Sequence, residues 1–344
     1  MDMHRVERIY LSQFSPARPD VYGLQATMLL PSPRAAPFAR FNPVPGWYAI
    51  GATTLQGAYT PDVDTFAYFR VMSPTARIGH AMFVYHVMEQ PKGQWVAQCA
   101  TQGALPPLDA DEIKAGFGRD DLRVVQFDCS TSWWYPAKDA PGWYANPVEG
   151  GLYVREQFLS GHAIYRPRNW QGGIAAVYRV DSVTTPADRK VQAIAAPGDW
   201  PPAQAITRGA TLAAPVVMTG PLQFEGFWLH ENKLAERPDG QIVVFTAWRV
   251  MRGADVPLSI MGHLLDAQGR VVSGSDGLGV PIEVWQVGDT IVQEHVFKTQ
   301  DLAPGTYWIE TGVYRLDTLE RYRILQEGQA VGDRLLLTSV EVKP

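Results

Sequence analysis

The sequence PGWYA stands at residues 45–49 and again at residues 141–145, and it indicates the fold more strongly than any other feature of the chain. Proline presets φ and glycine accepts positive φ, so the pair forms a tight turn, and the two aromatic residues after it favour extended backbone. Each copy therefore predicts a loop that leads into a strand. The related PGTY at residues 304–307 predicts a further strand entry.

Aromatic residues gather just before the second copy, where Trp133 and Trp134 are adjacent in the sequence. Such rings either pack inside a core or form a platform for a sugar or a lipid head group. Because large aromatic side chains most often serve cores, we expect Trp47 and Trp143 to lie mainly inside. We expect Trp133 and Trp134 to be the more exposed pair.

The composition is that of a folded protein of two domains. The chain has 344 residues, of which 46% are hydrophobic, and this is enough to bury a large core. Its formal net charge is −5 and its Lys and Arg residues are scattered, so nucleic acid is not an expected partner. No apolar run reaches the ~18 residues that a membrane helix requires, and the N-terminus lacks the apolar segment of a secretory signal.

Residues 1–183 alternate extended apolar runs with short helical patterns, which is typical of a layered α/β domain. The candidate strands are residues 8–13, 47–54, 81–87, 123–128 and 175–180. Short helices are predicted at residues 64–70 and 108–114. Because several of the strands have few polar interruptions, we expect a largely parallel sheet that is covered on both faces.

The rest of the chain differs in composition and in the spacing of its predicted strands. Residues 184–219 are rich in proline, alanine and threonine, which is typical of a linker or a long connecting loop. Residues 220–344 carry short strands separated by turn residues, and this predicts an antiparallel β-sandwich. The candidate strands here are residues 222–229, 242–250, 258–266, 271–273, 282–285, 291–297, 307–315 and 335–342. The expected fold class is therefore an α/β domain followed by an all-β domain.

Cys99 and Cys129 are the only cysteines, too few for a disulfide framework and without the spacing of a metal site. Each ends a strand-like run, so adjacent strands would bring the two together in one bridge. The alternative is a pair of free buried thiols, because cysteine is often a small core residue.

Sequence signatures of catalysis are absent. The chain has no glycine-rich dinucleotide or phosphate loop, no His-Glu-x-x-His and no Gly-x-Ser-x-Gly, and it predicts neither a cofactor nor a metal site. The strongest local candidate is Asp128, at the carboxyl end of a predicted strand, where ligands bind to open α/β sheets. Its alternative role is to cap a turn. The candidate ligand-binding residues are Trp47, His86, Asp128, Ser130, Trp133, Trp134 and Trp143.

Segments along nearly the whole chain carry a family resemblance. They are VERIYLSQF at residues 6–14, YG at 22–23, PGWYAI at 45–50, ARIG at 76–79, FVY at 83–85, HLLDAQGRVV at 263–272, PGTY at 304–307 and GVY at 312–314. Together they resemble the extracytoplasmic region of bacterial polyprenyl-phosphate-dependent membrane glycosyltransferases, which are similar to protein O-mannosyltransferases and aminoarabinose transferases. These motifs are structural and not catalytic.

The resemblance implies a multi-helix membrane domain that precedes this region and carries the catalytic acids. None of those acids can be assigned to the present chain, so it is expected to be a fragment or one half of a split protein that does not transfer sugar by itself. The implied location is extracytoplasmic, at the membrane. The implied partners are the membrane domain of the same enzyme and a glycan or a lipid-linked sugar.

Three hypotheses of function follow. In the first, the chain is a non-catalytic accessory region of a glycosyltransferase that positions an acceptor or contacts glycan. In the second, it is a free-standing enzyme that works around Asp128, with Ser130 or His86 as further groups. In the third, it is a purely structural module of the cell surface.

Overall fold

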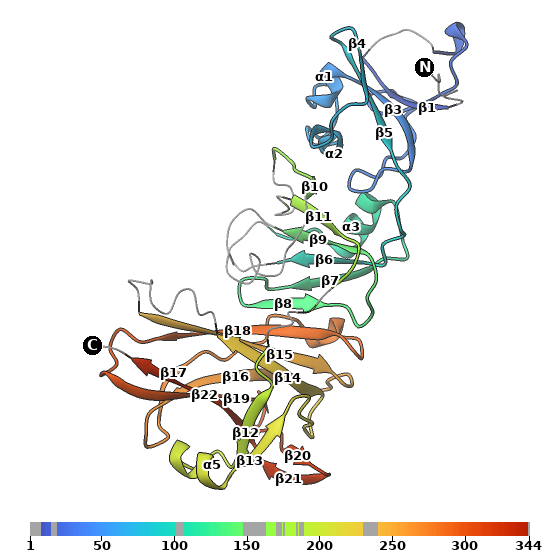
Figure 1. Ribbon diagram of the computed structural model, residues 1–344. Helices are drawn as coiled ribbons and strands as arrows, with labels where there is room; N and C mark the ends of the chain where they lie inside the picture. Colours follow the sequence, from blue (N-terminus) through green and yellow to red (C-terminus); the bar gives the residue numbers. More distant parts are fainter. Residues whose placement is uncertain are drawn as a thin grey trace. The chain divides into compact units, whose positions relative to one another are not determined.

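The computed structural model describes residues 8–14, 19–100, 106–146, 163–169, 174, 176–183, 185, 189–229 and 240–342. Strands dominate, and the helices are few and short (Figure 1). Within the described part of the chain, no helix has both the length and the apolar character needed to cross a membrane. The contacts divide the chain into two compact units. Unit 1 comprises Met1–Val125, Ala140–Gly150 and Ser160–Ser182, and unit 2 comprises Gln126–Asp139, Gly151–Leu159 and Val183–Pro344.

The first sheet of unit 1 has the strand order β2-β1-β3-β5-β4. Its strands are β1 (Ile9–Ser12), β2 (Ala26–Met28), β3 (Gly46–Gly51), β4 (Ala76–Ile78) and β5 (Met82–Val87). β1 runs parallel to β2 and β3, whereas β5 is antiparallel to β3 and β4. The short segments beside these strands are the 3-10 helix η1 (Pro19–Tyr22) and the helices α1 (Ala52–Leu55) and α2 (Ala67–Arg70).

The second sheet of unit 1 has the order β10-β11-β9-β6-β7. Its strands are β6 (Trp95–Cys99), β7 (Arg123–Phe127), β9 (Gly142–Asn146), β10 (Ala163–Tyr165) and β11 (Ala176–Val180). Helix α3 (Ala110–Phe117) connects β6 to β7. Asp109 and Glu112 form a capping box at its start, and Gly118 ends it with a positive φ of 64°.

One hydrophobic core runs through both sheets of unit 1. It includes Tyr48 and Phe69 from the first half and Phe117 and Trp143 from the second, each at most 2% exposed. The prediction of a largely parallel sheet holds only in part, because both sheets are mixed: β6 and β9 are parallel, but β11 is antiparallel to β9 and β10. Connections such as the one from β4 to β5 are too short for the crossover that parallel neighbours need.

Unit 2 contains two larger sheets in which the described strand pairs are antiparallel, as expected for this half of the chain. The six-stranded sheet has the order β13-β12-β22-β19-β16-β17, and the four-stranded sheet has the order β14-β15-β18-β8. The strands of the first are β12 (Gln192–Ala196), β13 (Ala210–Ala213), β16 (Leu258–Leu265), β17 (Val271–Gly274), β19 (Gly305–Arg315) and β22 (Arg334–Val342). Those of the second are β8 (Ser132–Tyr135), β14 (Leu222–Leu229), β15 (Gln241–Val250) and β18 (Thr290–Lys298).

Residues 184–219 do not form the predicted linker. They contain β12, β13 and the helix α5 (Pro202–Arg208), and β12 pairs with β22 inside the six-stranded sheet. Ala193, Ala195 and Ala196 are at most 2% exposed, so the alanines that suggested a linker are small core residues. The predicted strand at residues 282–285 is instead the 3-10 helix η4 (Ile282–Val284), and a small hairpin joins β20 (Ile324–Gln326) to β21 (Gln329–Gly332).

Strand β8 corrects both the predicted domain boundary and the predicted exposure of two tryptophans. β8 lies within residues 1–183, yet it forms the edge of the four-stranded sheet of unit 2 by pairing with β18. Trp133 and Trp134 are both 0% exposed, because this pairing places each ring in a core. They are therefore buried residues and not the exposed aromatic pair that the sequence suggested.

Candidate functional site

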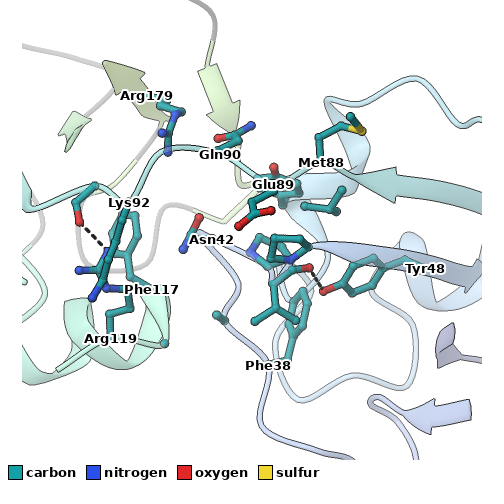
Figure 2. Close-up of a pocket in the computed structure, with 18 of the residues that line it drawn as sticks. Phe38, Asn42, Tyr48, Met88, Glu89, Gln90, Lys92, Phe117, Arg119 and Arg179 are labelled. Carbon is teal, nitrogen blue, oxygen red and sulfur yellow. Dashed lines mark hydrogen bonds between the residues drawn. The ribbon is translucent and has the colours of Figure 1, made fainter. Parts of the chain in front are cut away.

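A cavity of about 650 Å³ lies within unit 1. Three segments form most of its wall: the loop at residues 37–45, the connection at residues 88–93 that leads from β5 to β6, and the end of α3. Figure 2 shows Arg119 and Phe117 on one side and Tyr48 on the other. The volume lies within the range of small-molecule sites.

Both copies of the PGWYA sequence contribute to this wall. From the first copy come Pro45 and Tyr48, and from the second comes Trp143. Tyr48 stacks on Tyr10 with ring centroids 4.7 Å apart, and its hydroxyl donates a hydrogen bond to the carbonyl of Val44 at 2.7 Å. Tyr48 is therefore fixed on both its face and its hydroxyl.

Trp143 is held just as firmly on the other side of the cavity. Its ring contacts Phe117 with centroids 4.7 Å apart. A Cβ atom at Gly93 would lie 2.2 Å from the Trp143 ring, so only glycine lets the connection at residues 88–93 pass over it. The cavity is thus bounded by aromatic rings that packing has already ordered.

The cationic side chains at the cavity are bound to carboxylates and carbonyls of the chain itself. Arg119 contacts Asp121 through Nε at 2.8 Å and Nη2 at 2.9 Å, and its Nη1 donates to the Gly93 carbonyl at 2.5 Å. Lys92 Nζ lies 3.0 Å from Asp121. Hydrogen bonds from Arg119 and then Lys92 hold the pKa of Asp121 well below its usual range, so its carboxylate is ionised.

Arg179 is the third cation of the cavity wall. Its Nε contacts Asp181 at 2.7 Å and its Nη2 donates to the Pro91 carbonyl at 2.6 Å. The guanidinium also lies over the Trp143 ring, 5.5 Å from the centroid. Arg179 and Arg119 thereby fasten the connection at residues 88–93 to the second sheet.

Other polar groups at the cavity have no hydrogen-bond partner within the described residues. Tyr68 is 7% exposed, and burial raises the pKa of its phenol while the charge of Arg179 opposes the rise. Tyr68 lines the cavity, and its hydroxyl bonds to no described residue. The side chains of Asn42, Glu89 and Gln90 also bond to no described residue; Glu89 and Gln90 are exposed, so water can satisfy them. Figure 2 shows Asn42 and Glu89 between the Arg119 side and the Tyr48 side.

The seven residues predicted as a site are divided between the units: Trp47, His86 and Trp143 belong to unit 1, and Asp128, Ser130, Trp133 and Trp134 belong to unit 2. Of the seven, all of which the structure describes, only Trp143 lines the cavity. Trp47 and His86 oppose each other across β3 and β5, and their rings stack with centroids 4.3 Å apart. Asp128 Oδ1 accepts hydrogen bonds from the backbone nitrogen of Ser130 at 2.9 Å and from its hydroxyl at 2.5 Å. This is the geometry of a turn cap.

Sequence reasoning missed most of the cavity. Tyr68, Asn42 and Glu89 carry no motif, and nothing in their spacing connects them. The repeated PGWYA was the available signal, because its two copies provide Tyr48 and Trp143 on the cavity wall. Among the described residues, no group of His, Cys, Asp and Glu is arranged to hold a metal ion. Neither cysteine is a free thiol, since both are disulfide-bonded.

Unit 2 contains a cluster of charged residues. His263 Nδ1 lies 3.0 Å from Glu310 and its Nε2 lies 3.1 Å from Asp276. Glu310, 1% exposed, also contacts Arg334 at 2.6 Å. Burial by itself would lower the pKa of His263, but the hydrogen bonds to Asp276 and Glu310 outweigh it and raise the pKa to about 9.

This raised pKa predicts how the stability of unit 2 varies with pH. The folded protein binds the His263 proton more tightly than the unfolded chain does, so the stabilisation is complete below pH ~6.5 and is lost as the pH rises towards 9. After a discount for solvent screening, we expect a loss of about 2 kcal/mol over that interval. Urea unfolding at several pH values measures it. His263→Gln should flatten the decline, and an equal slope in both proteins would contradict the assignment.

In comparisons with known proteins, no family model matches the chain, and no curated protein sequence matches it.

Proposed function

We propose that this chain is a non-catalytic, extracytoplasmic accessory region of a lipid-linked-sugar-dependent glycosyltransferase, and that the cavity of unit 1 contacts glycan. The observation that carries the proposal is the pairing of ordered aromatic rings with unpartnered polar groups around one cavity. Sugars offer apolar ring faces that stack on aromatic side chains and hydroxyls that exchange hydrogen bonds. Tyr10 and Phe38, which line the cavity and are partly exposed, supply the first kind of surface, and Tyr68 and Asn42 supply the second.

The chemistry of the wall favours binding over catalysis. Nucleophilic or acid–base catalysis needs a reactive group with a partner in hydrogen-bond reach and a third group that orients the pair. Glu89 has no such partner among the described residues, and the nearby carboxylate of Asp121 is bound by Arg119 and Lys92. Catalysis is therefore assigned to a membrane domain of the same enzyme, with which this region would be associated at the outer side of the membrane.

A glycan array tests the binding part of this proposal. Fluorescently labelled full-length chain should bind oligosaccharides on the array. Tyr68→Phe removes one hydroxyl and leaves the ring, so we expect it to weaken the apparent affinity about 2–10-fold, the effect of a single hydrogen bond. Tyr22→Phe is the matched control, because Tyr22 is 74% exposed and lies outside the cavity.

Two results would count against the proposal. One is an array on which the wild-type chain binds no saccharide. The other is an equal loss of binding in Tyr68→Phe and Tyr22→Phe, which would place the contact outside the cavity. The non-catalytic part has its own test, because incubation of the chain with a polyprenyl-phosphate-linked sugar and an acceptor should give no transfer.

A further inference from the structure

The charges around the cavity show a balance that bears on the class of ligand. Three cations and one carboxylate line it, and two further carboxylates pair with the cations. The cations are Lys92, Arg119 and Arg179, and the carboxylates are Glu89, Asp121 and Asp181. Each of the three cations is therefore paired with Asp121 or Asp181, so an anionic ligand would find no unpaired cation among the described lining residues.

The cations are poorly placed to receive an anion. Arginine binds phosphate or carboxylate through two parallel N–H groups. In Arg119 the Nε and Nη2 groups already donate hydrogen bonds to Asp121. Arg179 donates hydrogen bonds from Nε to Asp181 and from Nη2 to the Pro91 carbonyl. Lys92 is 73% exposed, so its charge is largely screened by water.

Glu89 differs from the other two carboxylates because no described cation is paired with it. Figure 2 shows its side chain near Asn42 and Gln90, and Tyr68 lines the same cavity. Each of these groups can exchange hydrogen bonds with hydroxyls. A carboxylate accepts hydrogen bonds from sugar hydroxyls and repels a second carboxylate or a phosphate.

We infer that the cavity selects uncharged, hydroxyl-rich oligosaccharides and that Glu89 is the residue that excludes acidic ones. The inference rests on the proposed function, since it concerns the same cavity. It assigns to Glu89 a role in specificity: hydrogen bonding to a neutral sugar and repulsion of an anionic one. Asp121 and Asp181 cannot take this role, because Asp121 is paired with Arg119 and Lys92, and Asp181 is paired with Arg179.

The experiment is an array of neutral, uronic-acid-containing, phosphorylated and amine-bearing oligosaccharides, probed with the full-length chain. Wild-type protein should bind neutral members at least about tenfold more tightly than acidic ones, because two like charges about 4 Å apart repel by about 1 kcal/mol in bulk water and by more at a protein surface, where Glu89 is exposed. Glu89→Gln keeps the size and the hydrogen-bonding capacity of the side chain. It should bring acidic members to within about threefold of neutral ones and change neutral binding less than threefold.

Asp111→Asn is the matched control, since it removes one carboxylate from an exposed position on α3, away from the cavity, and should leave the preference unchanged. The inference is overturned if acidic or amine-bearing members bind the wild-type chain best, or if Glu89→Gln retains the tenfold preference. The absence of binding to every member by both proteins would overturn the proposed function itself. The two failures are therefore distinguishable.

Discussion

Replacing Asp64 with asparagine should lower the free energy of unfolding of unit 1 by about 3–5 kcal/mol, the usual effect of removing one partner from a buried ion pair. Asp64 is 1% exposed and pairs with Arg70. It also accepts hydrogen bonds from the backbone nitrogens of Arg168 and Asn169, both at 2.7 Å. The NH2 group of an asparagine would face one of these two backbone N–H groups and could not accept its hydrogen bond. The positive charge of Arg70 would also lose its counter-ion.

This substitution also matters for the cavity, because Arg70 and Tyr68 lie on the same short helix α2. Calorimetry of the full chain should show a melting transition lowered by roughly 6–20 °C, given the usual relation between stability and melting temperature for a unit of this size. Asp111→Asn, an exposed substitution on α3, should change it by less than 2 °C. If Asp64→Asn melts like the wild type, the buried pair does not hold unit 1 together.

Glu310→Gln should have a similar effect on unit 2. Glu310 is the shared carboxylate of Arg334 at 2.6 Å, His263 at 3.0 Å and Arg321 at 3.7 Å. Neutralising it leaves the buried Arg334 guanidinium, which is 1% exposed, without an anionic partner. We expect a loss of about 3–5 kcal/mol in urea unfolding.

The matched control is Glu225→Gln, because Glu225 also pairs with an arginine of unit 2, Arg249, at 2.9 Å. Arg249 is 46% exposed, so this pair is screened by water and should contribute less than about 1 kcal/mol. Equal losses in the two variants would show that burial of the Glu310 cluster has no energetic consequence. Glu310→Gln should also reduce the pH dependence assigned to His263, because the two groups are in contact.

Local sequence rules predicted the strand entries well. The turn of Pro-Gly and the aromatic pair after it act within a few residues, and β3, β9 and β19 begin at Gly46, Gly142 and Gly305 as predicted. Most of the strands predicted for residues 220–344 are also present, since alternation and turn residues separate them at short intervals, but residues 282–285 form no strand and β20 and β21 were not predicted. Long-range pairing was not predictable. Ser132 bonds to Gln293, 161 residues away, and this pairing buries Trp133 and Trp134.

The candidate site was less predictable than the fold for the same reason. Its wall gathers residues from β1, the loop at residues 37–45, α2, the connection at residues 88–93, α3 and β11. No interval in the sequence relates Tyr68 to Glu89 or Asn42. The predicted Asp128 and Ser130 form a local turn, because an aspartate at the end of a strand most readily bonds backbone and hydroxyl groups two residues away.

Photo-crosslinking tests the central claim most directly. An oligosaccharide chosen from the array is made with a diazirine group, irradiated with the full-length chain and located by peptide mass spectrometry. The account predicts adducts on peptides that carry residues 37–48 and 87–93, reduced in Tyr68→Phe and unchanged in Tyr22→Phe. Adducts confined to peptides of unit 2, or insensitive to Tyr68→Phe, would contradict it.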